Sequence, residues 1–345
     1  YIDYAKQGAF WPLDDFLGDP ETLPTLTGYP NYAYDMMRVD GKIFAIPSVR
    51  ISRPFNIHVR TDWLDQFGLD IPTTIDELGT VTDAFATRDP DGNGKRDTFG
   101  LMWWADPPNF ESLGVIRNGF GMITTWEEIE PGRIQPVWVT EKQRNMLGWL
   151  RDGISSRVFD PDSAIMSRGD VTETKSGTGR YGVHYCDSGG QVLNALHANN
   201  PDAQLMPLSP LLTPEGEFRY GVPWVYIGMW VVTRKVKSEE DVLRILQFMD
   251  WGSSPEGSEL MEFGMEGDYD VREDGSKTVN DTGTANGASA LWLIPPLDPY
   301  LYVKTERNTG HPELADAQQE LVDRISDQEV INPVLYTTPG PVELE

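Results

Sequence analysis

Cysteine is almost absent from this chain, because Cys186 is the single one among 345 residues. One thiol cannot form a disulfide within the chain, so the fold does not depend on disulfide bonds. The scarcity leaves the cellular compartment open, since exported bacterial proteins and many cytosolic proteins are both poor in cysteine.

Basic residues are also few, with 28 Lys and Arg against 54 Asp and Glu, which gives a formal net charge of −26. Phosphate backbones and anionic lipids repel such a chain, so we expect no nucleic acid as a partner and no binding to membrane surfaces. Long apolar runs are missing as well. The apolar stretch around residues 225–232 is far shorter than the roughly 18 residues that a membrane helix needs.

The common catalytic motifs are missing too. GxSxG, HExxH and CxxC do not occur, and the four histidines are dispersed: His58, His184, His197 and His311. Gly177–Gly182 spells GxGxxG, but a polar stretch precedes it and a strand pattern follows it, which is the reverse of a nucleotide site. A carboxylate pair for glycoside hydrolysis stays open, because 54 acidic residues always include some suitably spaced pair.

Aromatic residues, in contrast, are abundant at 11%, with 11 Trp and 13 Tyr. The CH faces of sugars stack on indole rings, and carboxylates accept hydrogen bonds from sugar hydroxyls. An acidic chain rich in aromatic residues is therefore typical of proteins that handle carbohydrates, whether they bind or cleave them.

Helical and strand patterns alternate along the chain. A turn signal at Asp40-Gly41 precedes a buried strand, and residues 55–59 alternate as a strand. Amphipathic or capped segments predict helices over these residues: 62–68, 72 onward, 140–153, 188–199, 238–251 and 312–325. This mixture predicts an α/β or α+β class rather than a β-sandwich or a helix bundle.

The most specific local motif is DPDGNGKRD at residues 89–97, which matches the first nine positions of an EF-hand calcium loop. Ca²⁺ prefers six to eight hard oxygen ligands, and a tight loop points alternate side chains at one centre. The expected ligands are the side chains of Asp89, Asp91, Asn93 and Asp97 and the carbonyl of Lys95. Position 12 is Gly100 instead of the bidentate Glu, so a complete EF-hand is not expected.

Several segments in succession resemble the extracellular solute-binding proteins (family 1) of bacterial ABC transporters, in the lipoprotein branch that binds oligosaccharides such as alginate. The segments that carry the resemblance are GAFWPLDD (8–15), DGKIFAIP (40–47), RTDWL (60–64), PTTIDEL (72–78), DPDGNGKRD (89–97), the helix over 238–251 and GMEGDY (264–269). In that branch a similar Asp/Asn/Gly loop is a structural calcium site, so the resemblance implies Ca²⁺ as a structural cofactor.

The resemblance implies an α/β fold of the two-lobed periplasmic-binding-protein type (type II), with a cleft between discontinuous lobes. We place lobe 1 at residues 1–52 plus 229–285, and lobe 2, with the calcium loop, at residues 53–228 plus 286–345. Members usually carry a signal peptide, a lipidated cysteine and a βαβ segment before the GAFWPLDD-like stretch. We therefore expect lobe 1 to be incomplete at its N-terminus.

A cleft for chain-like sugars needs flat aromatic platforms with polar groups between them, where two lobes meet. Residues beside the expected lobe crossings and at strand exits meet that need: Arg50, Arg53, Trp103, Trp104, Asp106, Tyr185, Asp187, Trp224, Tyr226 and Trp292. Arg50, Arg53 and Arg180 suit uronate carboxylates, but neutral sugars also bind arginine, so both ligand classes stay open.

The resemblance implies a non-enzymatic protein that binds an oligosaccharide and delivers it to an ABC-transporter permease. Its expected location is extracellular or periplasmic, as a membrane-anchored lipoprotein in the full-length form, and its expected state is a monomer. The alternative is a carbohydrate-active enzyme, a hydrolase or lyase that uses an acidic pair. Incubation with oligosaccharides separates the two, because a binder returns the sugar intact.

Overall fold

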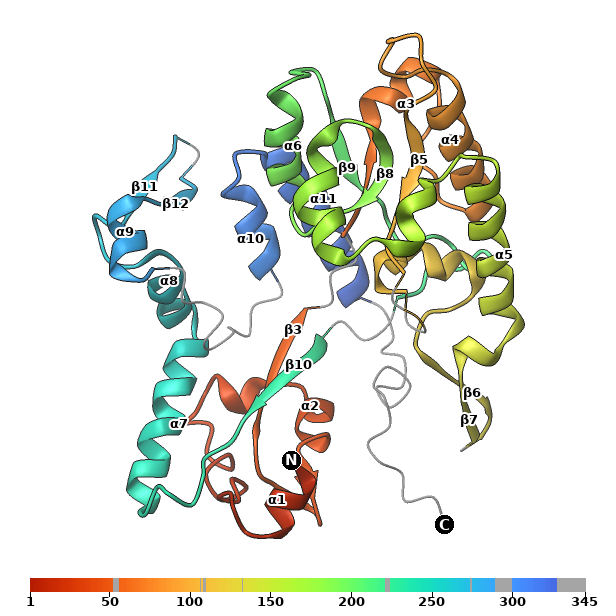
Figure 1. Ribbon diagram of the computed structural model, residues 1–345. Coiled ribbons are helices and arrows are strands. Elements are labelled where there is room, and N and C mark those ends of the chain that lie inside the picture. Colours follow the sequence, from red (N-terminus) through yellow and green to blue (C-terminus); the bar gives the residue numbers. More distant parts are fainter. Residues whose placement is uncertain are drawn as a thin grey trace. The chain divides into compact units, whose positions relative to one another are not determined.

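The computed structural model describes residues 1–51, 56–105, 107, 110–131, 133–220, 224–273, 275–288 and 300–327. For residues 32, 49–51, 111, 173–174, 224–227 and 301, the description is limited to the backbone. Helices and strands are mixed throughout, so the expected α/β class is confirmed (Figure 1). None of the helices in these ranges is long and apolar enough to cross a membrane.

The chain forms two compact units. Unit 1 comprises Tyr1–Ser52 and Trp224–Leu301, and unit 2 comprises Arg53–Pro223 and Tyr302–Glu345. The boundaries expected from the sequence, after residues 228 and 285, fall inside a strand and a helix of unit 1. A strand belongs with the partner that it pairs with along its length, so the structure keeps β10 whole in unit 1.

Unit 1 is built around the antiparallel ribbon of β3 (Ile46–Ile51) and β10 (Trp224–Trp230). Its other elements are α1 (Ile2–Lys6), η1 (Leu26–Gly28), α2 (Asn31–Asp35), β1 (Arg38–Val39), β2 (Lys42–Ile43), α7 (Glu239–Ser253), α8 (Pro255–Phe263), β11 (Tyr269–Val271), β12 (Lys277–Val279) and α9 (Asp281–Asn286). β1 and β2 pair on either side of the predicted Asp40-Gly41 turn, where both residues have positive φ. Ser238 caps α7 as the sequence predicts, and α7 buries Val242 and Leu246 in the core of the unit.

Unit 2 contains a four-stranded sheet in the order β5-β8-β4-β9. Its strands are β4 (Ile57–Arg60), β5 (Phe99–Met102), β8 (Tyr181–Tyr185) and β9 (Leu205–Pro207), with a separate hairpin of β6 (Trp126–Glu130) and β7 (Arg133–Pro136). Its helices are α3 (Thr61–Phe67), α4 (Ile75–Thr87), α5 (Glu141–Ser155), α6 (Gly189–His197), α10 (Leu301–Arg307) and α11 (Pro312–Ser326), with the 3₁₀ helices η2 (Glu111–Phe120), η3 (Val137–Val139), η4 (Pro161–Ile165) and η6 (Ser176–Thr178) and the π-helix η5 (Asp170–Lys175). β5 and β8 run parallel, so their carboxyl ends lie at the same edge of the sheet.

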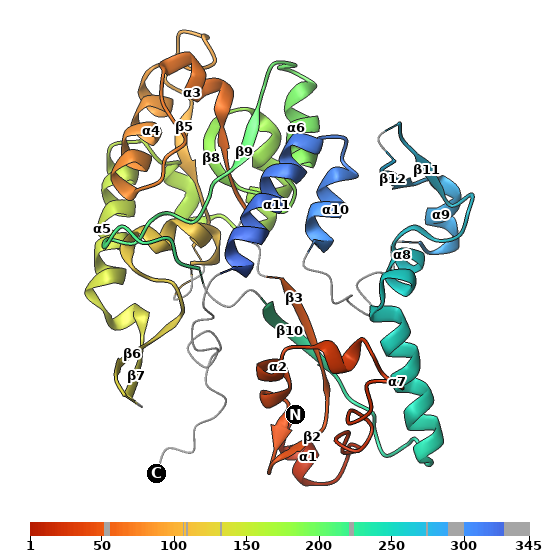
Figure 2. The ribbon, with the colours of Figure 1, turned by 180° about the vertical axis from the view of Figure 1, so that it is seen from behind.

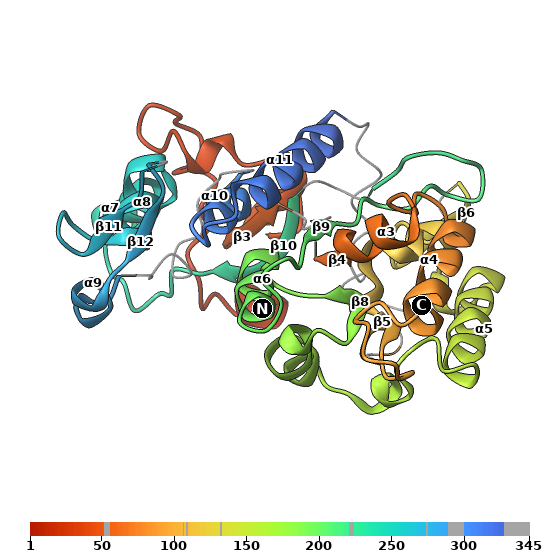
Figure 3. The same cartoon turned by 90° about the horizontal axis from the view of Figure 1, so that it is seen from above.

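Helices cover both faces of this sheet (Figures 2 and 3). On one face, α4 buries Leu78 and Phe85 in a large apolar core. On the other, α6 and α11 pack against β9 around a smaller cluster that includes Leu196, Leu205 and Leu314. Side chains on successive residues of a strand alternate between these two cores, which is the arrangement of an α/β layered fold.

Two glycines let α4 approach the sheet closely. A Cβ at Gly100 in β5 would lie 2.2 Å from the carbonyl oxygen of Thr82, and one at Gly182 in β8 would lie 2.0 Å from the ring of Phe85. Side chains at these two positions are therefore excluded by the packing of the helix on the sheet.

The segment from α10 to α11 is joined to α6 by polar contacts. The carboxylate of Glu306 accepts a hydrogen bond from the backbone N–H of Gly190, and burial raises the pKa of Glu306. The side chain of Asn194 donates to the carbonyl of Thr309 (3.3 Å) and lies 3.0 Å from Nε2 of His311. These contacts fix the later helices of unit 2 to the helix that follows β8.

Candidate functional site

Three of the predicted ligand residues meet at the carboxyl ends of β5 and β8. The rings of Trp104 and Tyr185 lie edge to face with their centroids 4.7 Å apart. The Tyr185 hydroxyl donates to Oδ1 of Asp187 (3.2 Å) and accepts from the side-chain amide of Asn56 (2.8 Å). Trp104, Tyr185 and Asp187 therefore form one connected group at this edge of the sheet.

Arg168 completes the group and was not predicted from the sequence. Its Nη2 donates to Oδ1 of Asp187 (2.6 Å), and its guanidinium carbon lies 6.0 Å from the centre of the Tyr185 ring. The Arg168 and Asp187 side chains are 55% and 39% exposed, so solvent reaches both. Arg168 lies in a polar stretch without periodicity, and nothing local signals its contact with a residue nineteen positions later. We call Trp104, Arg168, Tyr185 and Asp187 the edge cluster.

The two predicted indoles of β5 are largely buried. Trp103 and Trp104 are 4% and 5% exposed, and both belong to the main core of unit 2. Trp103 packs against Phe110, and its backbone N–H donates to Oγ of Ser163 (3.4 Å). Trp104 therefore contributes a buried ring to the edge cluster, and the exposed part of the cluster is the Arg168–Asp187 pair.

The other predicted ligand residues are described less fully. Arg50 pairs with Val225 in the backbone register of β3 and β10, and Trp224 and Tyr226 lie on the same ribbon in unit 1. Arg53, Asp106 and Trp292 lie outside the described residues. Their roles as ligand contacts stay predictions.

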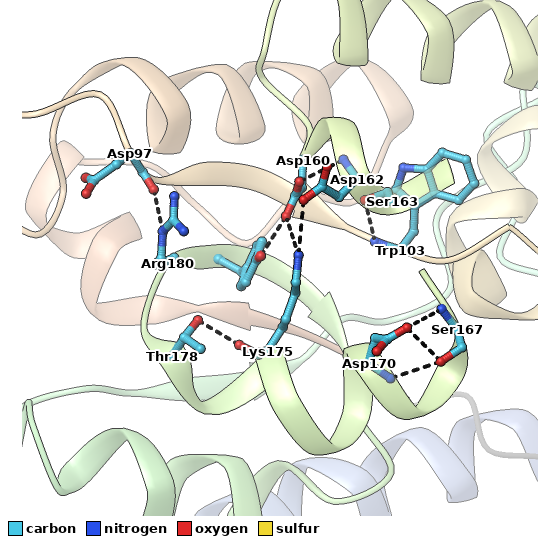
Figure 4. A network of polar contacts seen from close by, with 11 residues as sticks. Asp97, Trp103, Asp160, Asp162, Ser163, Ser167, Asp170, Lys175, Thr178 and Arg180 are labelled. Carbon is cyan, nitrogen blue, oxygen red and sulfur yellow. Dashed lines mark hydrogen bonds and ion pairs between the residues drawn. The ribbon is translucent and has the colours of Figure 1, made fainter. Parts of the chain in front are cut away.

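A polar network around Asp160 fixes the π-helix η5 to the strand β8 (Figure 4). Asp160 is 3% exposed, and its Oδ2 accepts from the Tyr181 hydroxyl at 2.6 Å and lies 3.5 Å from Nζ of Lys175. Burial raises the pKa of Tyr181, and the adjacent Asp160 carboxylate raises it further. Lys175 also lies 3.6 Å from Oδ2 of Asp162. The network anchors the end of η5 through a buried carboxylate.

A cavity of about 510 Å³ lies between η5, η6 and the beginning of α6. Its lining residues are mostly small or polar: Thr172, Ser176, Gly177, Thr178, Cys186, Asp187, Ser188, Gln191, Val192 and Ala195. Asp187 belongs both to this lining and to the edge cluster. Cys186 is 1% exposed with its Sγ 3.1 Å from Nδ1 of His58, and burial raises the pKa of the thiol, so it lacks the features of a reactive cysteine.

The loop predicted to bind calcium is held by its own side chains. Asp89 accepts hydrogen bonds from the backbone N–H groups of Asn93 (3.1 Å) and Gly94 (2.9 Å), and Gly94 has the positive φ of 75° that its position requires. The Asn93 amide nitrogen donates to carboxylates of both Asp91 (2.7 Å) and Asp97 (3.0 Å). Burial and the neighbouring Asp89 and Asp97 raise the pKa of Asp91.

This loop draws carboxylates together around a partly positive amide nitrogen, which is a place that suits a cation. Among the described residues, no three His, Cys, Asp or Glu side chains are placed to hold a metal ion by themselves. A calcium site here would therefore also use oxygens of Asn93 and Lys95. Gly100, at position 12, lies in β5 against the backbone of Thr82, so this strand has no room for the Glu of an EF-hand.

Comparisons with known proteins give relatives along nearly the whole chain. It is 28% identical over 338 residues to the polygalacturonan/rhamnogalacturonan-binding protein YtcQ of Bacillus subtilis. This alignment covers 95% of the chain and 65% of YtcQ. It is 27% identical over 282 residues to lipoprotein LipO of the same organism, covering 79% of the chain and 55% of LipO. The third relative, the fructooligosaccharide ABC transporter substrate-binding protein FusA of Streptococcus pneumoniae, is 32% identical over 132 residues, or 35% of the chain and 24% of FusA.

The chain is a homologue of ABC-transporter solute-binding proteins. The resemblance seen in the sequence is thereby confirmed. No protein-family model matches the chain, which spans about two thirds of the length of YtcQ and about half of that of LipO.

Solved structures of solute-binding proteins share its fold. FusA of S. pneumoniae in complex with kestose has a TM-score of 0.62 at 18% identity, covering 98% of this chain and 72% of that one. The alginate-binding protein AlgQ2, solved without calcium ion, has a TM-score of 0.62 at 21% identity, covering 96% and 70%. A FusA EF-hand mutant of S. pneumoniae in complex with fructo-nystose has a TM-score of 0.59 at 19% identity, covering 94% and 69%. The two-lobed, α/β fold class expected from the sequence is confirmed by these neighbours.

Proposed function

We propose that this chain is the substrate-binding part of an ABC importer and that its ligand is an oligosaccharide. The observation that carries the proposal is the alignment with YtcQ over 95% of the chain. YtcQ is named a polygalacturonan/rhamnogalacturonan-binding protein and FusA a fructooligosaccharide transporter substrate-binding protein, and both names support a sugar chain as the ligand.

The edge cluster supplies chemistry that suits such a ligand. The carboxylate of Asp187 and the guanidinium of Arg168 are exposed to solvent beside the ring of Tyr185. A carboxylate accepts hydrogen bonds from sugar hydroxyls, and a guanidinium donates to them, while an aromatic edge excludes water. We assign Asp187 and Arg168 to ligand contact, backed by the largely buried rings of Trp104 and Tyr185. We keep Arg50, Trp224 and Tyr226 of unit 1 as predicted contacts.

The same proposal places the protein outside the cytoplasm, with a permease as its partner. Its relatives include LipO, which is named a lipoprotein, and FusA, which is named a transporter substrate-binding protein. The relatives reported above are named as binding proteins or lipoproteins, so binding without cleavage is favoured over a hydrolase or lyase.

Addition of the correct oligosaccharide should raise the melting temperature of the protein. A ligand that binds only the folded state, at a free concentration of about 100 times its Kd, stabilises that state by about 2.7 kcal/mol. The probes are oligogalacturonides, rhamnogalacturonan oligosaccharides and kestose, measured by thermal shift and titration calorimetry. Chromatography after prolonged incubation should recover the bound sugar intact. Time-dependent release of shorter sugars would favour the enzyme alternative, and no shift with any probe would contradict the proposal.

We also propose that the loop at residues 89–97 binds one structural Ca²⁺. The carboxylates of Asp91 and Asp97 both lie within 3.0 Å of the Asn93 amide nitrogen, so they are already drawn together. The neighbouring charges that raise the pKa of Asp91 are repulsions that a bound cation relieves. The ion's part would be to neutralise these carboxylates and hold the loop between α4 and β5.

Removal of calcium should therefore lower the melting temperature without abolishing sugar binding. Asp91→Asn should remove most of the Ca²⁺-dependent stabilisation, because it replaces a charged ligand. Asp83→Asn, on the exposed side of α4 outside the loop, is the matched control and should keep the full response. Differential scanning calorimetry in EGTA and in millimolar Ca²⁺ checks both variants. Identical melting temperatures of the parent protein in the two buffers would exclude the site.

A further inference from the structure

The cavity between η5, η6 and α6 has the size of a small-molecule site, and several hydroxyl side chains line it. Its volume of about 510 Å³ falls within the roughly 300–1,000 Å³ of ligand pockets. Hydroxyl side chains come from two sides: Thr172, Ser176 and Thr178 from η5 and η6, and Ser188 from the residue that caps α6. Asp187 adds a carboxylate where the cavity meets the edge cluster.

The protons of these hydroxyls are already directed at protein acceptors. Thr172 donates to the carbonyl of Arg168 (3.0 Å), Ser176 to that of Thr172 (3.0 Å) and Thr178 to that of Lys175 (2.7 Å). Ser188 is hydrogen-bonded to the buried carboxylate of Glu306, which has no proton to give when ionised. A hydroxyl that has given its proton to the protein still has lone pairs for a ligand. Apart from the side-chain amide of Gln191, the polar lining therefore offers mainly acceptors, and it suits a ligand that brings donors.

The N-terminus of α6 does not turn this cavity into an anion site. The backbone N–H of Gly190 donates to Glu306, and that of Gln191 donates to Oγ of Ser188 at 3.3 Å. Both N–H groups are therefore used within the protein. Among the described lining residues the charged side chain is Asp187, whose carboxylate is paired with Arg168. A carboxylate-bearing sugar would bring further acceptors to a lining whose hydroxyls already offer acceptors.

We infer that this cavity is a subsite for a neutral, hydroxyl-rich sugar unit that adjoins the edge cluster. The inference rests on the proposed function and deepens it, because it states the chemical class of one unit of the ligand. The hydroxyls of a neutral unit donate to the acceptors of the lining, and Asp187 links this subsite to the rest of the ligand through the edge cluster.

The position of the subsite depends on the Asp160 network. Lys175 ends η5, and its contacts with Asp160 and Asp162 hold the turn that carries Thr172 and Ser176 (Figure 4). A π-helix is an uncommon element that is frequent at functional sites. Here η5 carries Thr172, and the directly following η6 carries Ser176, along one wall of the cavity. The side chains of the wall are thus fixed before a ligand arrives.

The test fills the cavity from its exposed wall. Gln191→Trp introduces an indole at an exposed position of α6 that lines the cavity, and Gln319→Trp, at an exposed position of α11 that does not line it, is the matched control. Titration calorimetry uses kestose, rhamnogalacturonan oligosaccharides and oligogalacturonides as probes. Gln191→Trp should weaken binding of the probes that contain neutral units by about tenfold or more, while Gln319→Trp should bind like the parent protein.

A second variant tests the acceptors without filling the space. Thr172→Val together with Thr178→Val keeps the shape of both side chains and removes two acceptors. The double variant should bind the same probes with about tenfold lower affinity. Unchanged affinities in both variants, with the parent still binding sugar, would overturn the subsite and leave the proposed function standing. An equal loss of affinity for oligogalacturonides, whose units are all acidic, would contradict the inference that the subsite binds a neutral unit. A parent protein that binds none of the probes would contradict the proposed function itself.

Discussion

Gly100→Ala should lower the free energy of unfolding by at least about 3 kcal/mol, the upper end of the usual cost of overpacking a core. The added Cβ would lie 2.2 Å from the carbonyl oxygen of Thr82 and 2.6 Å from its Cα. These are backbone atoms of α4, so no side-chain rotation relieves the contact. The helix has to move off the sheet, and the large core beneath it has to repack.

Gly79→Ala is the control for this prediction, because it makes the same change at a position of α4 that has open space for a Cβ. Nothing lies within 4 Å of a Cβ at Gly79, so the substitution should raise stability by up to about 1 kcal/mol through helix propensity. Chemical denaturation, followed by circular dichroism, measures both variants. If Gly100→Ala and Gly79→Ala have similar stabilities, the packing of α4 on β5 is described wrongly.

The second large effect is expected from Asp160→Ala, with a loss of about 3 kcal/mol in the free energy of unfolding. The substitution leaves the buried Tyr181 hydroxyl without its acceptor at 2.6 Å and removes the closer carboxylate partner of Lys175. It also removes the side-chain cap of η4, because Asp160 accepts from the backbone N–H of Asp162.

Asp162→Ala separates the buried network from a simple loss of charge. Asp162 lies at a similar distance from Lys175, at 3.6 Å, but its side chain is 64% exposed. An exposed ion pair contributes at most about 1 kcal/mol, so this variant should remain close to the parent protein. Equal losses for the two variants would mean that the charge near Lys175, and not the buried acceptor, carries the stability.

Much of this fold was predictable from local patterns. The helix expected over residues 238–251 is α7 (Glu239–Ser253), and that expected over 312–325 is α11 (Pro312–Ser326). Caps and apolar spacing act within one element, so the sequence displays them directly. The capping box that Thr74 and Glu77 form at the beginning of α4 is another such local signal.

The candidate site was predictable only in part, because its contacts join distant segments. Trp104, Tyr185 and Asp187 were predicted as residues at strand exits, and parallel pairing of β5 with β8 brings them together. Arg168 comes from an irregular stretch whose place is set by the fold around it. The cavity lining was missed for the same reason, since hydroxyl side chains in a polar stretch give no signal until η5 is placed beside α6.

The interleaved order of the two units has a consequence for how the chain is made. The last strand of the unit 2 sheet ends at Pro207, yet the helix that supplies Leu314 and Val322 is synthesised only after the second segment of unit 1. At about 5–20 residues per second, that interval is on the order of 10 s. During it, the apolar surface around Leu196 and Leu205 has no α11 to cover it. A nascent chain of this protein must therefore avoid aggregation while this smaller core is still uncovered by α11, and unit 2 cannot be completed before unit 1 has been synthesised.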